Sequence, residues 1–403
     1  MKDYFSLAFN NLRRRKLRAW LTMIGIFIGI AAVVALISLG QGLQNAITQQ
    51  FEQLGSDKII IMPSVFAPPG SITTESLLLT NKDNEFLRGI RGVEETAGFI
   101  MKYGQIGYKD EMKVIAVLGL APEDEKFWNE LNFMKMADGR NYNSGEKYKV
   151  VVGYNHAYKD TWDKPIKLGS TIKIEGQEFK VVGIMEKTGD PGNDGSVYIQ
   201  KETLRELFNA PKEESMIYVK VASGFDPEDV ANDIERKLRK FRNEKEGEET
   251  FSVQTSEQLL ESFQSIFGVV QAVLVGIAGI SLVVGGIGIM NTMYTADLER
   301  TKEIGTMKAV GAKNSDILIL FLFEAGLLGL VGGAIGIAIG YGLGKTAEIL
   351  ASRALGTDLL QASFPWYLIL GALLFSFLVG AAAGVTPAYQ ASRLKPADAL
   401  RYE

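Results

Sequence analysis

The sequence contains no cysteine among its 403 residues, and His156 is its single histidine. The absence of cysteine excludes a disulfide framework and catalysis by a thiol. Because His156 has no second histidine or cysteine to join it, a metal site or a Ser-His relay has little support. The formal net charge of −4 gives no reason to expect a nucleic-acid partner. We therefore expect neither a metal site nor a nucleic-acid interface.

Two short motifs resemble ligand sites but have the wrong spacing. Tyr341–Thr346 contains the Gly-Lys-Thr of a phosphate-binding loop, but Ile339 stands where that loop needs its first glycine. Asp190–Gly195 is acidic, yet it lacks the spacing and the terminal glutamate of an EF-hand, so it predicts a turn between strands. We find no other catalytic constellation, and we expect no catalytic residue and no enzyme activity in this chain.

Four runs of the sequence are nearly free of charge, and each is close to the ~20 residues that cross a bilayer core. They cover residues 20–39, 267–294, 317–341 and 366–385. The first follows the basic segment 13–16, as in a signal peptide, but it is longer than a signal core and no small-x-small cleavage site follows it. We therefore expect a retained anchor and an integral membrane α-helical protein with four transmembrane helices.

Basic residues predict the orientation of these helices. Residues 1–19 contain six lysines and arginines against one acid, Asp3. The loop 295–316 and the C-terminal tail are also rich in basic residues, whereas the loop 342–365 has two. Basic flanks remain in the cytoplasm. We therefore expect a multi-pass protein of the plasma or inner membrane, with both termini inside and residues 40–266 outside.

The segment between the first two apolar runs predicts a large extracytoplasmic α+β domain on a helical stalk. Ser38–Leu54 continues the first membrane helix with apolar residues at helical spacing, and Thr255–Gln258 is a capping box at the start of the second. The expected strands are 58–62, 93–103, 108–118, 150–152, 171–175, 178–184 and 251–253, and the expected helices 83–90 and 226–242. Their order predicts a βαβ-like lobe from 57–104 and 215–254, with a β-rich lobe of about 105–200 inserted. The chain then divides into 1–40, 41–266 and 267–403.

The stretch 299–316 lies between the second and third apolar runs and is too charged to lie in lipid. Ile304, Met307 and Val310 recur at steps of three, which predicts a short amphipathic helix, 299–311, at the membrane surface. Gly311 is the expected helix stop, and Ser315 the expected cap of the next helix. Such a helix can transmit a push from a soluble partner, with Ile304 and Met307 as its apolar anchors. The candidate residues are Glu299, Arg300, Glu303, Ile304, Gly305, Met307 and Lys308.

Glycines recur every four residues within the apolar runs. This spacing lets helix backbones approach closely. It leaves open whether the close contacts form within one subunit or between subunits. The candidate packing residues are Gly25, Gly29, Gly332, Gly336, Gly340, Gly344, Gly380 and Gly384.

Glu324 is an acidic residue inside the third apolar run. Acids within a membrane are costly and are candidates for function. Glu324 lies only about two turns from the basic loop, so it can reach the interface or pair there. We favour a structural or coupling role over a transport site.

Several motifs, taken in order, resemble those of MacB/FtsX-type ABC transporter permeases (type VII, mechanotransmission). The loop Glu299–Asp316 resembles the family sequence after the second membrane helix. Further similar segments are Asn11–Arg18, Leu21–Gly29, Val151–Gly153, Leu168–Ile172, Phe179–Ile184, Phe323–Gly329 and Thr386–Arg401. The resemblance extends over most of the chain.

The resemblance implies four membrane helices, a stalk and an outer domain with Porter and Sabre lobes. It implies a dimer of permeases, expected here to be a homodimer, with two cytoplasmic ABC ATPase subunits that bind ATP and Mg, and it allows for an extracytoplasmic adaptor. Residues 299–311 would be the ATPase-coupling helix, and ATP-driven closure of the ATPases would move the outer domain. This chain departs from full-length MacB because it lacks the fused ATPase.

Two functions remain open at this point. The first is a permease subunit that couples ATP hydrolysis to export or extrusion of macrolide-like, peptide-like or lipoprotein-like substrates. The second is a non-transporting transmembrane anchor that recruits or activates a cell-wall enzyme. The sequence does not name the substrate.

Overall fold

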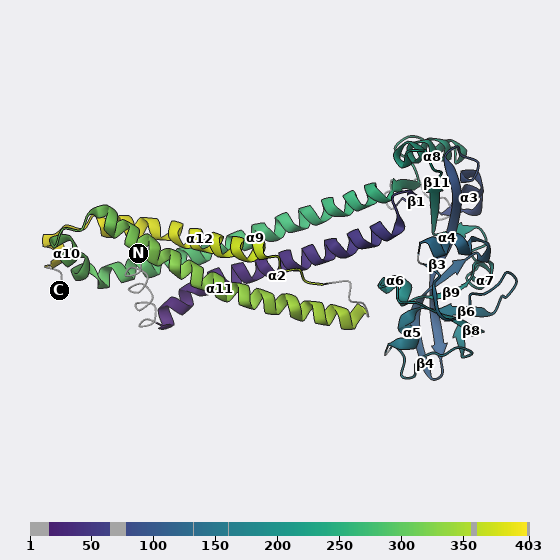
Figure 1. The fold of residues 1–403 in the computed structure, drawn as a ribbon, viewed down its shortest axis with the longest axis horizontal. Coiled ribbons are helices and arrows are strands. Elements are labelled where there is room, and N and C mark those ends of the chain that lie inside the picture. Colours follow the sequence, from purple (N-terminus) through teal and green to yellow (C-terminus); the bar gives the residue numbers. More distant parts are fainter. Residues whose placement is uncertain (1–15, 65–77, 132, 160, 356–360, 401–403) are drawn as a thin grey trace. The chain divides into compact units, whose positions relative to one another are not determined.

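The computed structural model describes residues 16–64, 78–131, 133–159, 161–355 and 361–400. The chain divides into two units, which are drawn in Figure 1. We call the first the membrane unit; it contains the chain up to Gln44, Ile266–Ala351 and the chain from Leu360 onward. We call the second the outer unit; it contains Asn45–Ser265 and Ser352–Leu359. Most of the N-terminal basic segment, residues 1–19, for which a helix is expected, lies outside the described residues.

Four long helices supply the membrane unit: α2 (Lys16–Leu54), α9 (Ser256–Glu299), α11 (Asn314–Leu355) and α12 (Trp366–Ser392). In the part of the chain that the structure describes, these four are long and apolar enough to cross a membrane. A helix satisfies its own backbone hydrogen bonds, so apolar runs of this length become helices in lipid. α2 and α9 extend well beyond their apolar runs, as the stalk interpretation expects.

Glycines bring the long helices into backbone contact within this chain. A methyl group on Gly25 of α2 would come within 2.6 Å of the Cα of Gly285 on α9, and one on Gly336 of α11 would meet the carbonyl of Phe27 at 2.7 Å. Gly29, Gly340, Gly344, Gly380 and Gly384 also lie against neighbouring segments of the membrane unit, and Gly332 is buried. Side chains at Gly25 and Gly336 would push the helices apart, so these two contacts require glycine.

The outer unit is built on one ten-stranded sheet with the order β12-β1-β11-β3-β4-β9-β6-β8-β5, in which β7 pairs with β3 and β8. Its strands are β1 (Lys58–Pro63), β3 (Val93–Tyr108), β4 (Glu111–Leu120), β5 (Met136–Gly139), β6 (Lys149–Val152), β7 (Thr171–Ile174), β8 (Gln177–Met185), β9 (Val197–Gln200), β11 (Met216–Val221) and β12 (Phe251–Thr255). β2 (Leu79–Thr80) and β10 (Glu213–Glu214) form a separate pair. β12, where a strand was expected at 251–253, is an edge strand of this sheet.

β3 links the two halves of this sheet. Its first half pairs with β11, from Val93 to Phe99, and its second half pairs with β4, from Ile100 to Tyr108. The expected strand 93–103 is therefore longer than its sequence pattern indicated. Because the halves share one strand, the sheet is continuous, and the division into Porter and Sabre lobes stays a prediction.

Short helices cover the sheet. They are α3 (Asn81–Leu87), α4 (Glu125–Glu130), α5 (Tyr154–Tyr158), α6 (Pro191–Asp194), α7 (Lys201–Leu207) and α8 (Pro227–Phe241), with a 3-10 turn at Pro122–Asp124. α3 and α8 lie beside β1 and β11 at one end of the sheet (Figure 1). There Leu87 and Ile234 pack on Ile59 and Val219, all fully buried.

Local sequence signals account for several element ends. Thr255 and Gln258 exchange the two hydrogen bonds of the predicted capping box, at 3.1 Å each. Asp226 caps α8 by accepting from the backbone N–H groups of Glu228 and Asp229. β7 and β8, which the sequence predicts as strands 171–175 and 178–184, form a hairpin. Its turn residues Glu175 and Gly176 both have positive φ, as a type I′ turn requires.

His156 is buried in the outer unit and has a structural role. Trp162 Nε1 donates to His156 Nδ1 at 3.1 Å, so the ring proton lies on Nε2, which faces the Gly195 carbonyl at 3.0 Å. Burial lowers the pKa of His156 to about 4, and the hydrogen bond to Gly195 opposes that shift. The neutral imidazole is therefore the form that the fold accommodates.

This burial predicts a pH-dependent loss of stability. The unfolded chain takes up a proton on His156 near pH 6.5 and the folded chain only near 4, so the unfolding free energy falls as the pH drops through that window. The full contribution is about 3 kcal/mol. Thermal unfolding followed by tryptophan fluorescence at pH 7 and 4.5 should show a smaller loss for His156→Gln than for the wild type. Equal losses would contradict the assignment.

Candidate functional site

The charged stretch between the second and third long helices folds as α10 (Thr301–Ala309), which begins directly after α9. Gly311 follows with φ of +108°, a conformation that favours glycine, and it ends the helix as predicted. α11 begins at Asn314, so Ser315 lies inside its first turn and is not the cap. Instead, the Asp316 carboxylate accepts from the Lys313 backbone N–H at 3.0 Å. The sequence therefore predicted the start of α11 correctly, but it assigned the capping role to Ser315 where Asp316 makes the hydrogen bond.

One face of α10 packs on the membrane unit itself. Ile304 is fully buried, Gly305 is buried, and Met307 packs at the edge of the same cluster with Ile317 and Ala391. The expectation that Ile304 contacts a partner is therefore wrong, because its side chain has no surface left to offer. Ile304 anchors α10 to its own helix bundle.

Lys308 fixes the C-terminal end of α10. Its ammonium group donates to the carbonyls of Ser392, at 2.5 Å, and Leu394, at 2.8 Å, where α12 ends. Carbonyls at a helix C-terminus lack intrahelical partners and carry partial negative charge, so a lysine stabilises them. Burial lowers the pKa of Lys308. α10 also packs against α13 (Pro396–Leu400), which follows these carbonyls.

An ion pair joins α10 to the third long helix. Arg300, which precedes α10, donates to both carboxylate oxygens of Glu324 at 2.9 and 3.1 Å, and both side chains are largely buried. Glu324 was expected to reach the interface or to pair there, and it pairs. Asp297, one turn before α10, is also buried, and neither of its carboxylate oxygens has a hydrogen-bond partner among the described residues. The apolar bundle thus holds a small charged cluster beside α10.

The opposite face of α10 is open. Glu303 is exposed, as are Lys302, Thr306 and Val310, and Val310 has 86% of its surface accessible. The spacing of three had grouped Val310 with Ile304. At 100° per residue, however, six positions rotate the side chain about 120° away from Ile304. The large exposed apolar side chain of this segment is therefore Val310, the residue that directly follows α10, and the periodicity pattern misplaced it.

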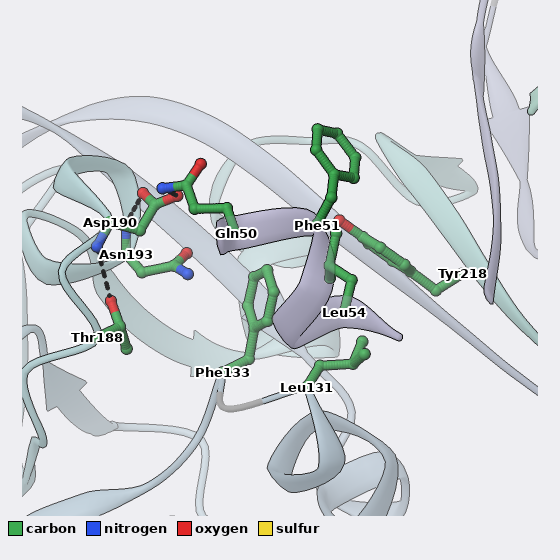
Figure 2. Close-up of a pocket in the computed structure, with 9 residues that line it drawn as sticks. All are labelled: Gln50, Phe51, Leu54, Leu131, Phe133, Thr188, Asp190, Asn193 and Tyr218. Atoms are coloured by element: carbon green, nitrogen blue, oxygen red, sulfur yellow. Dashed lines mark hydrogen bonds between the residues drawn. The ribbon is translucent and has the colours of Figure 1, made fainter. Parts of the chain in front are cut away.

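A pocket of about 130 Å³ lies in the outer unit, where the end of α2 meets the sheet (Figure 2). Apolar and aromatic side chains line its right and centre in Figure 2, and polar side chains gather on its left. The lining residues are Gln50, Phe51, Leu54, Leu131, Phe133, Thr188, Asp190, Asn193 and Tyr218. They come from segments far apart in the sequence, and no motif marks them together.

The two motifs that resemble ligand sites in the sequence belong to helices in the structure. Tyr341–Thr346 lies inside α11, not in a loop after a strand. Asp190 caps the short helix α6, where a turn was expected. Over the described residues, no group of three metal-ligating side chains is close enough to hold an ion.

Family models match most of the chain. Residues 19–237 match the MacB-like periplasmic core domain, and residues 275–396 match the FtsX-like permease C-terminal domain. The first match covers most of the outer unit, and the second covers α10 with the helices on either side of it. Together they place α10 inside a known permease domain.

Curated relatives match along the full chain. It is 37% identical over 408 residues to an uncharacterized ABC transporter permease of Methanocaldococcus jannaschii, covering 100% of this chain and 98% of the relative. It is 30% identical to the uncharacterized ABC transporter permease YknZ of Bacillus subtilis, covering 98% of each. It is also 30% identical to the macrolide export ATP-binding/permease protein MacB of Bdellovibrio bacteriovorus, covering 100% of this chain but 62% of that protein.

Among solved structures, the periplasmic region of MacB from Actinobacillus actinomycetemcomitans resembles the outer unit weakly. The TM-score is 0.43 at 13% identity, over 54% of this chain and 97% of that one. The extracellular domain of YknZ gives a TM-score of 0.39 at 19% identity, over 49% of this chain and 100% of that one. At these values the likeness adds nothing to the relationship that the sequences show.

The Arg300–Glu324 pair predicts a large and recoverable loss of stability. Arg300→Met leaves Glu324 largely buried without its cation, so the unfolding free energy should fall by about 2–4 kcal/mol. Adding Glu324→Gln should restore most of it. Lys345→Met breaks the more exposed Lys345–Glu348 pair and should cost less than about 1 kcal/mol. Thermal unfolding in detergent measures all four proteins. A double variant no more stable than Arg300→Met would show that the pair is not coupled.

Proposed function

This chain belongs to the MacB/FtsX-like family of ABC transporter permeases, and from that premise we propose that it couples ATP hydrolysis by a separate cytoplasmic ATPase to movement of its outer domain. We propose export or extrusion as the purpose of this movement. The anchor hypothesis receives no support from the relatives, whose names describe permeases and macrolide export.

The observation that carries the proposal is the way α10 is held. Ile304, Lys308 and the Arg300–Glu324 pair attach one side of α10 to the membrane unit at three points. The other side leaves Glu303 and Val310 accessible. A short helix fixed to its own bundle on one face and open on the other moves with the bundle when a partner pushes it. This arrangement supports α10 as the coupling helix.

ATP and Mg are proposed to bind the partner ATPase and not this chain. The sequence lacks the first glycine of a phosphate-binding loop at Ile339. The name of the relative MacB of Bdellovibrio bacteriovorus describes an ATP-binding/permease protein, which supports an ATPase as the working partner of such a permease. We further propose two ATPase subunits for two copies of the permease.

A second copy of this chain is proposed to pack on α9. One side of that helix exposes a continuous row of apolar side chains, including Val273, Ile280 and Ile287. A Cβ on Gly276 would meet nothing within 4 Å, whereas Gly285 is in tight contact with α2. Asn291 is exposed at the end of the same row. A polar side chain and an open glycine suit a helix partner better than lipid tails.

An extracytoplasmic partner such as an adaptor is proposed for the β3–β4 hairpin. Four large apolar side chains there are exposed: Met101, Tyr103, Met112 and Val114. Exposed apolar patches of this kind often mark protein-binding surfaces.

The orientation predicts a one-sided labelling pattern. Since the chain has no cysteine, each introduced thiol is the only one present. Cysteine at the exposed position Lys167 should react with an impermeant maleimide on intact cells. Cysteine at the exposed position Thr306 should react only after permeabilisation. The opposite pattern would reverse the topology and place α10 out of reach of a cytoplasmic ATPase.

The exposed face of α10 predicts which substitution uncouples the ATPase. Val310→Asp places a charge on an accessible apolar side chain, so the fold should remain while binding of the ATPase weakens by about 1–4 kcal/mol. Leu168→Asp, at an exposed apolar residue of the outer unit that lies outside the β3–β4 hairpin, is the matched control. Pull-down of the ATPase and ATP hydrolysis in liposomes are the measurements. If Val310→Asp binds and hydrolyses as Leu168→Asp does, α10 is not the coupling helix.

A further inference from the structure

The pocket in Figure 2 has one charged residue among the nine that line it, the carboxylate of Asp190. Within the described residues, every hydrogen bond to that carboxylate comes from a neutral donor. Oδ1 accepts from the backbone N–H groups of Gly192, at 2.6 Å, and Asn193, at 3.0 Å, and Oδ2 accepts from the Gln50 side-chain amide at 3.2 Å. None of the described residues that line the pocket is a lysine or arginine that could neutralise it.

The other side of the pocket is an aromatic wall. Phe133 and Tyr218 meet edge to face, with ring centroids 6.2 Å apart, and Phe51 adds a third ring. Trp128 stands behind two of them, 5.7 Å from Phe133 and 5.8 Å from Tyr218, and is fully buried. Burial raises the pKa of Tyr218 to about 12, so its hydroxyl is neutral at physiological pH. The pocket therefore combines one negative charge with rigid aromatic faces.

We propose that this pocket binds a protonated organic amine, with the ammonium group at Asp190 and an apolar group against Phe133 and Tyr218. Aromatic faces attract cations through their quadrupole, and a carboxylate completes the recognition. The volume of about 130 Å³ limits the enclosed part of the ligand to roughly one ring, since a cavity of about 150 Å³ accommodates benzene.

Binding of an amine in this pocket would change a contact of α2, because the end of α2 forms part of the pocket wall. Gln50, Phe51 and Leu54 lie on the last turns of α2, and Gln50 is a direct partner of Asp190. An ammonium group at Asp190 competes with the Gln50 amide for the same oxygen. Amine binding would thus exchange a contact between α2 and the loop before α6 for a contact with the ligand. Any effect of that exchange on ATP hydrolysis rests on the proposed function, whereas binding itself does not.

The first test compares three probes of one size and different charge on the full chain in nanodiscs. Benzylamine is cationic at pH 7, benzyl alcohol is neutral and benzoate is anionic. Calorimetry, corrected with empty nanodiscs, should give benzylamine a dissociation constant on the order of 1–10 mM, the range for so small a ligand. It should bind at least about tenfold more tightly than the other two. Absence of saturable benzylamine binding, or equal affinities for the three probes, would overturn the proposal.

The second test removes the charge and keeps the cap. Asparagine caps a helix about as well as aspartate, so Asp190→Asn should fold normally. It should lose the preference for benzylamine over benzyl alcohol. Asp226→Asn is the matched control, because Asp226 also precedes a proline and also caps with two backbone N–H groups. It should keep the preference. Retention of the preference in Asp190→Asn would place the amine elsewhere.

A third variant tests the aromatic wall. Phe133→Leu should weaken benzylamine and benzyl alcohol together, by at least about threefold, because it removes a ring that both contact. Unchanged affinities would exclude the wall from the site. With the ATPase present, benzylamine that binds without changing hydrolysis would leave the amine site standing and contradict the coupling proposed above.

Discussion

The backbone contact between Gly25 and Gly285 is the constraint on which the membrane unit depends. In lipid there is no hydrophobic gain in bringing helices together, so their association relies on close packing. A methyl group on Gly25 would lie 2.6 Å from the Gly285 Cα, and α2 and α9 can touch only because neither residue has a side chain. The C-terminal end of α2 and the N-terminal end of α9 also meet in the outer unit, where the rings of Phe51 and Phe263 lie 6.0 Å apart. The two helices are thus paired within both units.

Beside α10, an ion pair as well as close packing holds the helices of the membrane unit together. Glycine contacts hold apolar surfaces together, whereas Arg300 and Glu324 hold two helices together by charge where water is scarce. Asp297 adds a second buried carboxylate, which finds no hydrogen-bond partner in the part of the chain that the structure describes. Arg300 is therefore a single cation beside two carboxyl groups, Glu324 and Asp297, in a site of low dielectric constant, where charges interact strongly. This arrangement makes this end of the bundle sensitive to any movement of Arg300, which directly precedes α10.

Much of this architecture could be predicted from the sequence, because the signals are local. The four apolar runs, the Thr255–Gln258 capping box and the hairpin turn at Gly176 each depend on residues close together in the chain. The partner of Glu324 and the exposure of Val310 depend on how helices rotate and pack, which periodicity describes only approximately. The pocket could not be predicted at all, since Phe51, Phe133 and Tyr218 come together only in the folded domain.

The sheet order has a consequence for biosynthesis. β1 pairs with β11 on one side and β12 on the other, and more than 150 residues separate Ile61 from Ile217, its partner on β11. During synthesis at about 5–20 residues per second, β1 waits roughly 8–30 seconds for its first neighbour. Throughout that interval the run Ile59-Ile60-Ile61, buried in the finished sheet, has two unpaired edges outside the membrane. Nascent chains from which β11 has not yet emerged should therefore aggregate or require a holding chaperone, whereas chains from which β11 and β12 have both emerged should not.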